Sequence, residues 1–107
     1  MFEQYKEIAE ICKALSDSNR LMILDMLSED ELCACKILEK FQITQPTLSH
    51  HMKSLCQCGL VESHKVGKWT HYNINQAKFK EFYAVLMAMT SFKQPQKPEG
   101  GNCKCKP

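Results

Sequence analysis

Three absences bound what this sequence encodes. No apolar run approaches the roughly 20 residues that cross a bilayer. The first ten residues, MFEQYKEIAE, carry glutamates where a signal peptide has a basic segment and an apolar core. No Ser/His/acid or Cys/His set and no phosphate-binding glycine loop is evident. We therefore expect a cytoplasmic protein that is not an enzyme, has no membrane partner and needs no organic cofactor.

The cysteines lack the spacing of a structural zinc site. The chain has seven of them, and C-x(2–4)-C never occurs. Six form three C-x-C pairs, namely Cys33 with Cys35, Cys56 with Cys58, and Cys103 with Cys105. In a reducing compartment, this pattern and the odd count favour metal binding or redox sensing over a disulfide framework.

Charge is distributed unevenly along the 107 residues, although the net charge is only +2. Residues 1–41 hold nine acidic and five basic side chains, which gives −4. Residues 42–69 give +2 and residues 70–107 give +4. The first third would repel nucleic acid, whereas the middle and the C-terminal part would tolerate it.

Apolar periodicity predicts a mainly α fold with one β-hairpin. The predicted elements are helices over residues 2–15 and 20–27, a third with the apolar stripe Ala34, Ile37, Leu38 and Phe41, a fourth from about Thr44 to Gly59, hairpin strands over 60–65 and 68–74, and a last helix over 76–92. Leu48, Met52 and Leu55 form the expected buried face of the fourth helix. The hairpin turn is placed at Val66-Gly67.

The third and fourth helices are separated by a very short turn, which is the layout of a helix-turn-helix. The outward side chains of the fourth helix are hydrogen-bond donors without a carboxylate: Gln45, Thr47, Ser49, His50, Lys53 and Ser54. A helix in the major groove uses such groups for base edges and phosphates. Lys65 and Lys68, near the hairpin tip, would contact phosphate. The alternative is a solvated polar face, and this helix lacks arginine, the commonest partner of guanine.

Two longer motifs carry a family resemblance. ELCACKILEKFQITQPTLSHHMKSL, followed by a GLV…GKWTHY hairpin, resembles the ArsR/SmtB family of metal-responsive repressors, most closely the arsenical-resistance repressors. The likeness covers about residues 5–92. It implies a homodimeric winged helix-turn-helix that binds palindromic operator DNA and leaves it when an inducer binds, with the first and last helices forming the dimer interface. We expect residues 1–93 to form this domain and residues 94–107, rich in Lys, Pro and Cys, to form a flexible tail.

The resemblance also implies an inducer site. The similar repressors bind As(III) or Sb(III) through the cysteines of the ELC-x-C motif, which correspond to Cys33 and Cys35. Many have a third cysteine where this chain has Leu38, so Cys103 and Cys105 are candidate additional ligands, or else an exposed pair that scavenges metal. In a helix, side chains two positions apart point about 200° apart. We therefore expect the first turn to unwind when both sulfurs bind one ion.

Several alternatives remain at this point. The same fold could sense thiol oxidation or persulfides, or cadmium and lead, although this chain starts too close to its first helix for the cysteine-bearing extension of the cadmium and lead sensors. The family's zinc site is not expected, because residues 76–92 contain no histidine or aspartate. A metal-sequestering module is a further alternative. We expect Cys12 to pack at the dimer interface, Cys56 to lie at the surface and Cys58 in the core.

Overall fold

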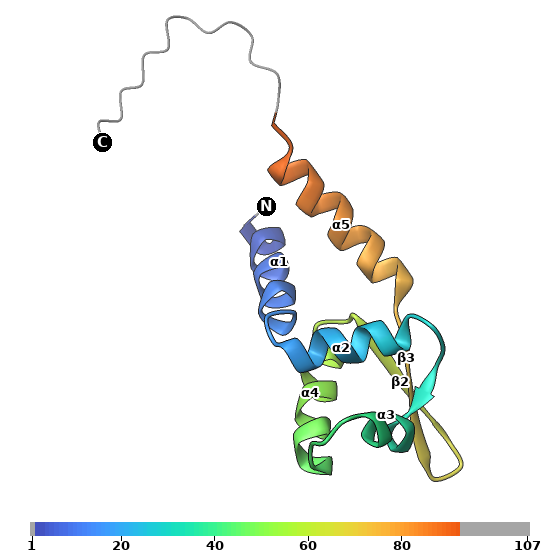
Figure 1. The fold of residues 1–107 in the computed structure, drawn as a ribbon. Coiled ribbons are helices and arrows are strands. Elements are labelled where there is room, and N and C mark those ends of the chain that lie inside the picture. The colour runs from blue at the N-terminus through green and yellow to red at the C-terminus, as the bar shows by residue number, and fades with distance from the viewer. Residues whose placement is uncertain (1, 93–107) are drawn as a thin grey trace, which may run out of the picture.

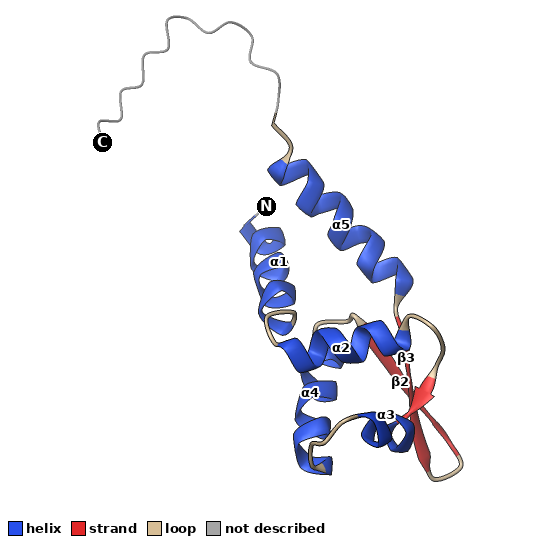
Figure 2. Cartoon of the chain, in the orientation of Figure 1, coloured by secondary structure: helices blue, strands red, loops and turns tan. Residues whose placement is uncertain are grey.

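The computed structural model describes residues 2–92, which form a mainly helical fold with one small sheet (Figures 1 and 2). In chain order the elements are α1 (Phe2–Ala14), α2 (Ser18–Leu27), β1 (Leu32–Cys33), α3 (Ala34–Lys40), α4 (Gln45–Gln57), β2 (Val61–Val66), β3 (Trp69–Ile74) and α5 (Gln76–Thr90). The five expected helices and the hairpin are all present. The expected tail lies outside the described residues.

The sheet is antiparallel, with strand order β1-β3-β2. Strands β2 and β3 pair from Val61 opposite Ile74 to Val66 opposite Trp69. The turn is therefore Gly67-Lys68, one residue later than predicted, and Gly67 takes a left-handed φ of +69°. The short edge strand β1 was not expected from the sequence.

Side-chain caps explain where three helices begin. Asp17 accepts hydrogen bonds from the backbone N–H groups of Asn19 and Arg20, so α2 starts at Ser18, two residues earlier than predicted. Asn75 accepts from the backbone N–H of Lys78 at 3.1 Å and caps α5. Thr44 caps α4, as predicted.

The core lies where α2, α3 and α4 meet the sheet. Its most completely buried large side chains are Ile23, Ile37, Leu48, Met52, Leu55 and Leu60. The predicted inner face of α4 is thus confirmed. Helices α1 and α5 extend from this body on the same side (Figure 1). Within residues 2–92, no helix is long and apolar enough to cross a membrane.

Candidate DNA interface and cysteine site

The hydroxyl of Thr44 fixes the start of α4, the second helix of the helix-turn-helix. It accepts a hydrogen bond from the backbone N–H of Thr47 at 3.3 Å and donates one to the Thr47 hydroxyl at 2.9 Å. Pro46 lies in the first turn, where a backbone N–H has no helical partner to lose. Because α3 ends at Lys40, only residues 41–44 join the two helices.

The outer face of α4 carries polar side chains that are open to solvent. The exposed residues are those predicted to contact DNA: Gln45, Thr47, Ser49, His50 and Lys53. Ser54 is half-buried. On the wing, Lys65 near the end of β2 and Lys68 in the turn are also exposed. The structure presents every predicted DNA-contacting side chain to solvent, and their contacts with DNA stay a prediction.

The inner face of α4 contains a buried histidine, His51, which is 6% exposed. Its Nδ1 accepts a hydrogen bond from Nε of Arg20 on α2 at 3.1 Å. The same guanidinium donates to the carbonyl of Ala14, at the end of α1, at 3.3 Å. Arg20 therefore joins three helices, including the one predicted to read DNA.

Asp17 lies at the start of the helix that carries Arg20. Desolvation raises the pKa of Asp17, but backbone hydrogen bonds from Asn19 and Arg20, with the nearby guanidinium, lower it further, so the pKa is below its usual value. The carboxylate thus stays charged at neutral pH and stabilises the positive end of α2.

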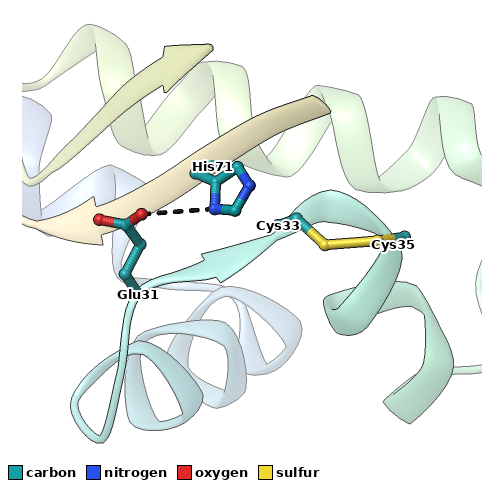
Figure 3. Close-up of a disulfide and its surroundings, with 4 residues drawn as sticks. All are labelled: Glu31, Cys33, Cys35 and His71. Carbon is teal, nitrogen blue, oxygen red and sulfur yellow. Dashed lines mark ion pairs between the residues drawn. A yellow bond between two sulfur atoms is a disulfide. The ribbon is translucent and has the colours of Figure 1, made fainter. Parts of the chain in front are cut away.

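The two cysteines of the ELC-x-C motif lie at the junction of β1 and α3. Cys33 has extended backbone angles, φ −84° and ψ 161°, and occupies the N-cap position, so it lies outside the helix that contains Cys35. The structure joins the two residues by a disulfide, with a Cα–Cα distance of 5.4 Å (Figure 3). The expectation that the first helical turn must unwind is therefore wrong, because the extended backbone at Cys33 already directs the sulfurs together.

A carboxylate two residues before Cys33 is shared by two histidines. Oε2 of Glu31 lies 3.3 Å from Nε2 of His64 and 3.3 Å from Nδ1 of His71. These histidines are opposite one another on β2 and β3, and Cys33 on β1 is opposite His71. Figure 3 shows Glu31 and His71 on adjacent segments beside the cysteine pair. The segment that leads into Cys33 is thus attached to both strands of the wing.

Neither the cysteine pair nor this cluster is a complete metal centre. Within residues 2–92, no three Cys, His, Asp or Glu side chains are grouped so that they could hold a metal ion. Cys103 and Cys105, the candidate additional ligands, lie outside the described residues. A third protein ligand for Cys33 and Cys35 would therefore have to come from those residues, from another subunit or from a rearranged side chain.

The other described cysteines lie in different environments. We had expected Cys56 to lie at the surface, but it is half-buried against the core. Its burial raises the pKa of the Cys56 thiol, although a hydrogen bond with Ser63 opposes the shift. Cys58 also packs against the core and contacts the carbonyl of Leu55. Cys12 is exposed on α1.

Sequence reasoning missed the contacts that link distant segments. Arg20 and His51 are 31 positions apart, and no local pattern pairs them. The Glu31 cluster depends on the register of three strands, one of which has only two residues. The QPT-x-SHH motif did place two adjacent histidines on α4, and helical periodicity from Leu48 could have indicated that His51 faces inward.

Comparisons with known proteins agree with this geometry. Residues 17–63 match the family model described as bacterial regulatory protein, arsR family. The arsenical resistance operon repressor of Staphylococcus aureus is 47% identical over 102 residues, which cover 95% of this chain and 91% of that protein. The cadmium resistance transcriptional regulatory protein of Listeria innocua is 48% identical over 67 residues, covering 62% of this chain and 56% of that protein.

Solved structures show the same architecture. An ArsR-like transcriptional regulator from Rhodococcus sp. RHA1 superimposes with a TM-score of 0.75 at 30% identity, covering 81% of this chain and 82% of that one. A homodimeric winged helix-turn-helix DNA-binding domain from Mycobacterium bovis gives 0.69 at 27% identity, with coverages of 81% and 82%. The predicted winged helix-turn-helix fold is confirmed, and the curated relatives are repressors rather than enzymes.

Proposed function

This chain belongs to the arsR family of bacterial regulatory proteins, and from this membership we propose that it is a dimeric repressor released from operator DNA when As(III) or Sb(III) binds Cys33 and Cys35. The observation that carries the proposal is the convergence of the two sulfurs at the start of α3. That helix leads through residues 41–44 into α4. The inducer pair therefore lies close in sequence to the DNA-reading helix.

The chemistry of the pair fits a thiophilic ion. When reduced, the two cysteines offer soft thiolate donors, which select As(III) or Sb(III) over hard cations. Cys35 lies in the first turn of α3, where the helix N-terminus favours a thiolate. Binding by two sulfurs requires no helix unwinding. Cys103 or Cys105 would supply a third sulfur.

The DNA-binding arm consists of α4 and the wing. The N-terminal part of α4 offers Gln45, Thr47, Ser49 and His50 for base edges, while Lys53, Lys65 and Lys68 neutralise phosphates. The whole chain carries only one arginine, Arg20, and its guanidinium is already bonded to His51 and Ala14. Sequence reading therefore depends on amides, hydroxyls and imidazole.

The dimer interface would use α1 and α5, as the family resemblance implied. Large apolar side chains are exposed on these helices and just after α5 in the single chain: Phe2, Tyr5, Tyr83, Met87, Met89 and Phe92. A hollow of about 400 Å³ between the helices is lined by residues of both. A second copy of the chain would cover this surface.

Release of the repressor from operator DNA would follow from the position of Cys33, which belongs to two elements. It ends β1 and also occupies the N-cap position of α3, and it is opposite His71 on the wing strand β3. A metalloid that holds Cys33 to Cys35 therefore acts on the route into α4 and on the wing together. The coupling between ligand and DNA needs to be about 1–3 kcal/mol for a useful switch.

The test compares two matched C-x-C pairs. We expect the Cys33→Ser/Cys35→Ser variant to bind operator DNA, obtained by selection from random sequences, but to stay bound when arsenite is added. The Cys56→Ser/Cys58→Ser variant should be released like the native chain, because those sulfurs pack against the core. Normal release of the first variant in a gel-shift titration would disprove the assignment.

The disulfide between Cys33 and Cys35 supports a second candidate function, thiol redox sensing. Its formation removes two protons and two electrons from the two thiols, while a hydroperoxide is reduced to an alcohol and water. We expect peroxide to release native protein from the operator without metalloid, and dithiothreitol to restore binding. Cys35→Ser should abolish this release. A dimer that stays bound under peroxide yet leaves with arsenite would exclude the redox function.

A further inference from the structure

A groove with an acidic rim lies between α2, the loop that follows it, the end of β3 and the first half of α5. Its volume is about 700 Å³. Four carboxylates line it, those of Asp25, Glu29, Asp30 and Glu31, and no lysine or arginine does. Leu21 and Tyr83, which are 50% and 52% exposed, add apolar surface. The groove therefore suits a ligand that combines positive charge with a modest apolar surface.

We propose that residues 93–107 of the same chain dock in this groove. Their sequence, KQPQKPEGGNCKCKP, holds four lysines against one glutamate, and its three prolines and the cysteines add apolar surface. The charges are thus complementary, because a lysine-rich segment would meet a groove whose lining has four carboxylates and no lysine or arginine.

Residues 93–107 are long enough to reach the groove from the end of α5. Helix α5 has 15 residues, so its ends are about 22 Å apart. Residues 93–107 number fifteen and span up to about 50 Å when extended. A chain that leaves the C-terminal end of α5 can therefore return along the helix to the groove beside its N-terminal half.

A second copy of the chain and DNA are poorer occupants. A two-fold symmetric contact centred on the groove would set its four carboxylates against the same four in the partner. DNA would be repelled for the same reason. The hollow between α1 and α5 that a second copy would cover is lined by different residues, and Tyr83 lies between the two surfaces on α5.

Docking would bring two more thiols to the cysteine site. Glu31 in the groove wall precedes Cys33 by two residues, a distance of about 7 Å along an extended strand. Cys103 and Cys105 are adjacent in sequence to Lys104 and Lys106, so binding of these lysines at the acidic rim would bring the two sulfurs within reach of Cys33. This consequence rests on the proposed function, whereas the docking itself does not.

The experiment follows the backbone amides of the full-length, reduced chain by NMR without metalloid. Reversing the tail charges with Lys93→Glu, Lys97→Glu, Lys104→Glu and Lys106→Glu should shift the amides of residues 25–31 and 76–83. Arginine at the same four positions is the matched control and should leave these amides unchanged. In the native chain, raising the salt to about 1 M should move the same amides in the direction that charge reversal does.

A charge exchange completes the test. Asp25→Lys, Glu29→Lys and Asp30→Lys, combined with the reversed tail, should restore the native chemical shifts of α5. The proposal is overturned when tail reversal leaves the groove amides unmoved, when it moves only the outer face of α4 and the wing, or when groove amides respond to protein concentration but not to the tail.

A separate readout concerns the extra ligands. X-ray absorption of the arsenite-loaded full chain should count three sulfurs around arsenic, and two in the Cys103→Ser/Cys105→Ser variant. Because the NMR experiment contains no arsenite, docking can fail or succeed independently of metalloid sensing. Three sulfurs in both proteins would show that the tail supplies none.

Discussion

Single residues of this chain serve more than one element, and Cys33 is the clearest case. It ends a strand, occupies the N-cap position of a helix and is joined to Cys35. The motif suggested helical geometry throughout, and under that assumption the two sulfurs diverge. The N-cap conformation reverses that conclusion, because an extended residue followed by a helical turn brings side chains two positions apart to the same side. A one-residue difference in a helix boundary thus decides whether the proposed ligand site is preformed.

His51 provides a prediction at the same scale. Replacing it with leucine removes the acceptor for Nε of Arg20 and leaves a half-buried donor without its partner. We expect the free energy of unfolding to fall by about 1–3 kcal/mol. Urea denaturation at fixed protein concentration measures this change.

The adjacent residue His50 is the matched control for that measurement. It is exposed, so His50→Leu should change the free energy of unfolding by less than about 0.5 kcal/mol while weakening operator binding. Combining His51→Leu with Arg20→Met should cost less than the sum of the two single changes, because they disrupt one contact. Equal losses from His50→Leu and His51→Leu would contradict the assigned contact.

The elements differ in how far their sequence determined them. Helix α4 was predicted with its cap and its buried face, because Thr44, Pro46 and the apolar spacing all specify the same start and the same inner side. The hairpin was predicted one residue out of register, because either glycine-containing pair could form the turn, and the pairing of Val66 with Trp69 selects Gly67-Lys68.

Strand β1 could not be predicted from local pattern. It has two residues, too few for alternation, and it exists because β3 offers a free edge to the segment after α2. The same pairing positions Cys33 opposite His71 and brings Glu31 to the wing histidines. The residue types of the candidate site were thus readable from sequence, whereas its link to the wing arises only from tertiary pairing.

At the scale of the whole molecule, the described chain is a winged helix-turn-helix body with two helices, α1 and α5, whose apolar side chains are only partly covered. The most completely buried large side chains lie in the body, whereas α1 and α5 leave several large apolar side chains exposed. A single copy also presents only one α4, whereas a symmetric operator needs two at a fixed separation. Dimerisation through α1 and α5 would satisfy both requirements.

Met87→Glu tests this arrangement, because Met87 is 64% exposed on α5 and a charge there would be buried by a second copy. We expect the dimer dissociation constant, measured by analytical ultracentrifugation, to rise at least about 30-fold, which corresponds to about 2 kcal/mol for a central interface position. Operator affinity should fall as the dimer dissociates, since separated subunits bind half-sites independently.

Met22→Glu is the matched control: Met22 is 51% exposed on α2, away from this surface, so that variant should remain dimeric. A Met87→Glu protein that stays dimeric and keeps its operator affinity would place the interface elsewhere. Loss of dimer in both variants would instead indicate that α2 also belongs to it.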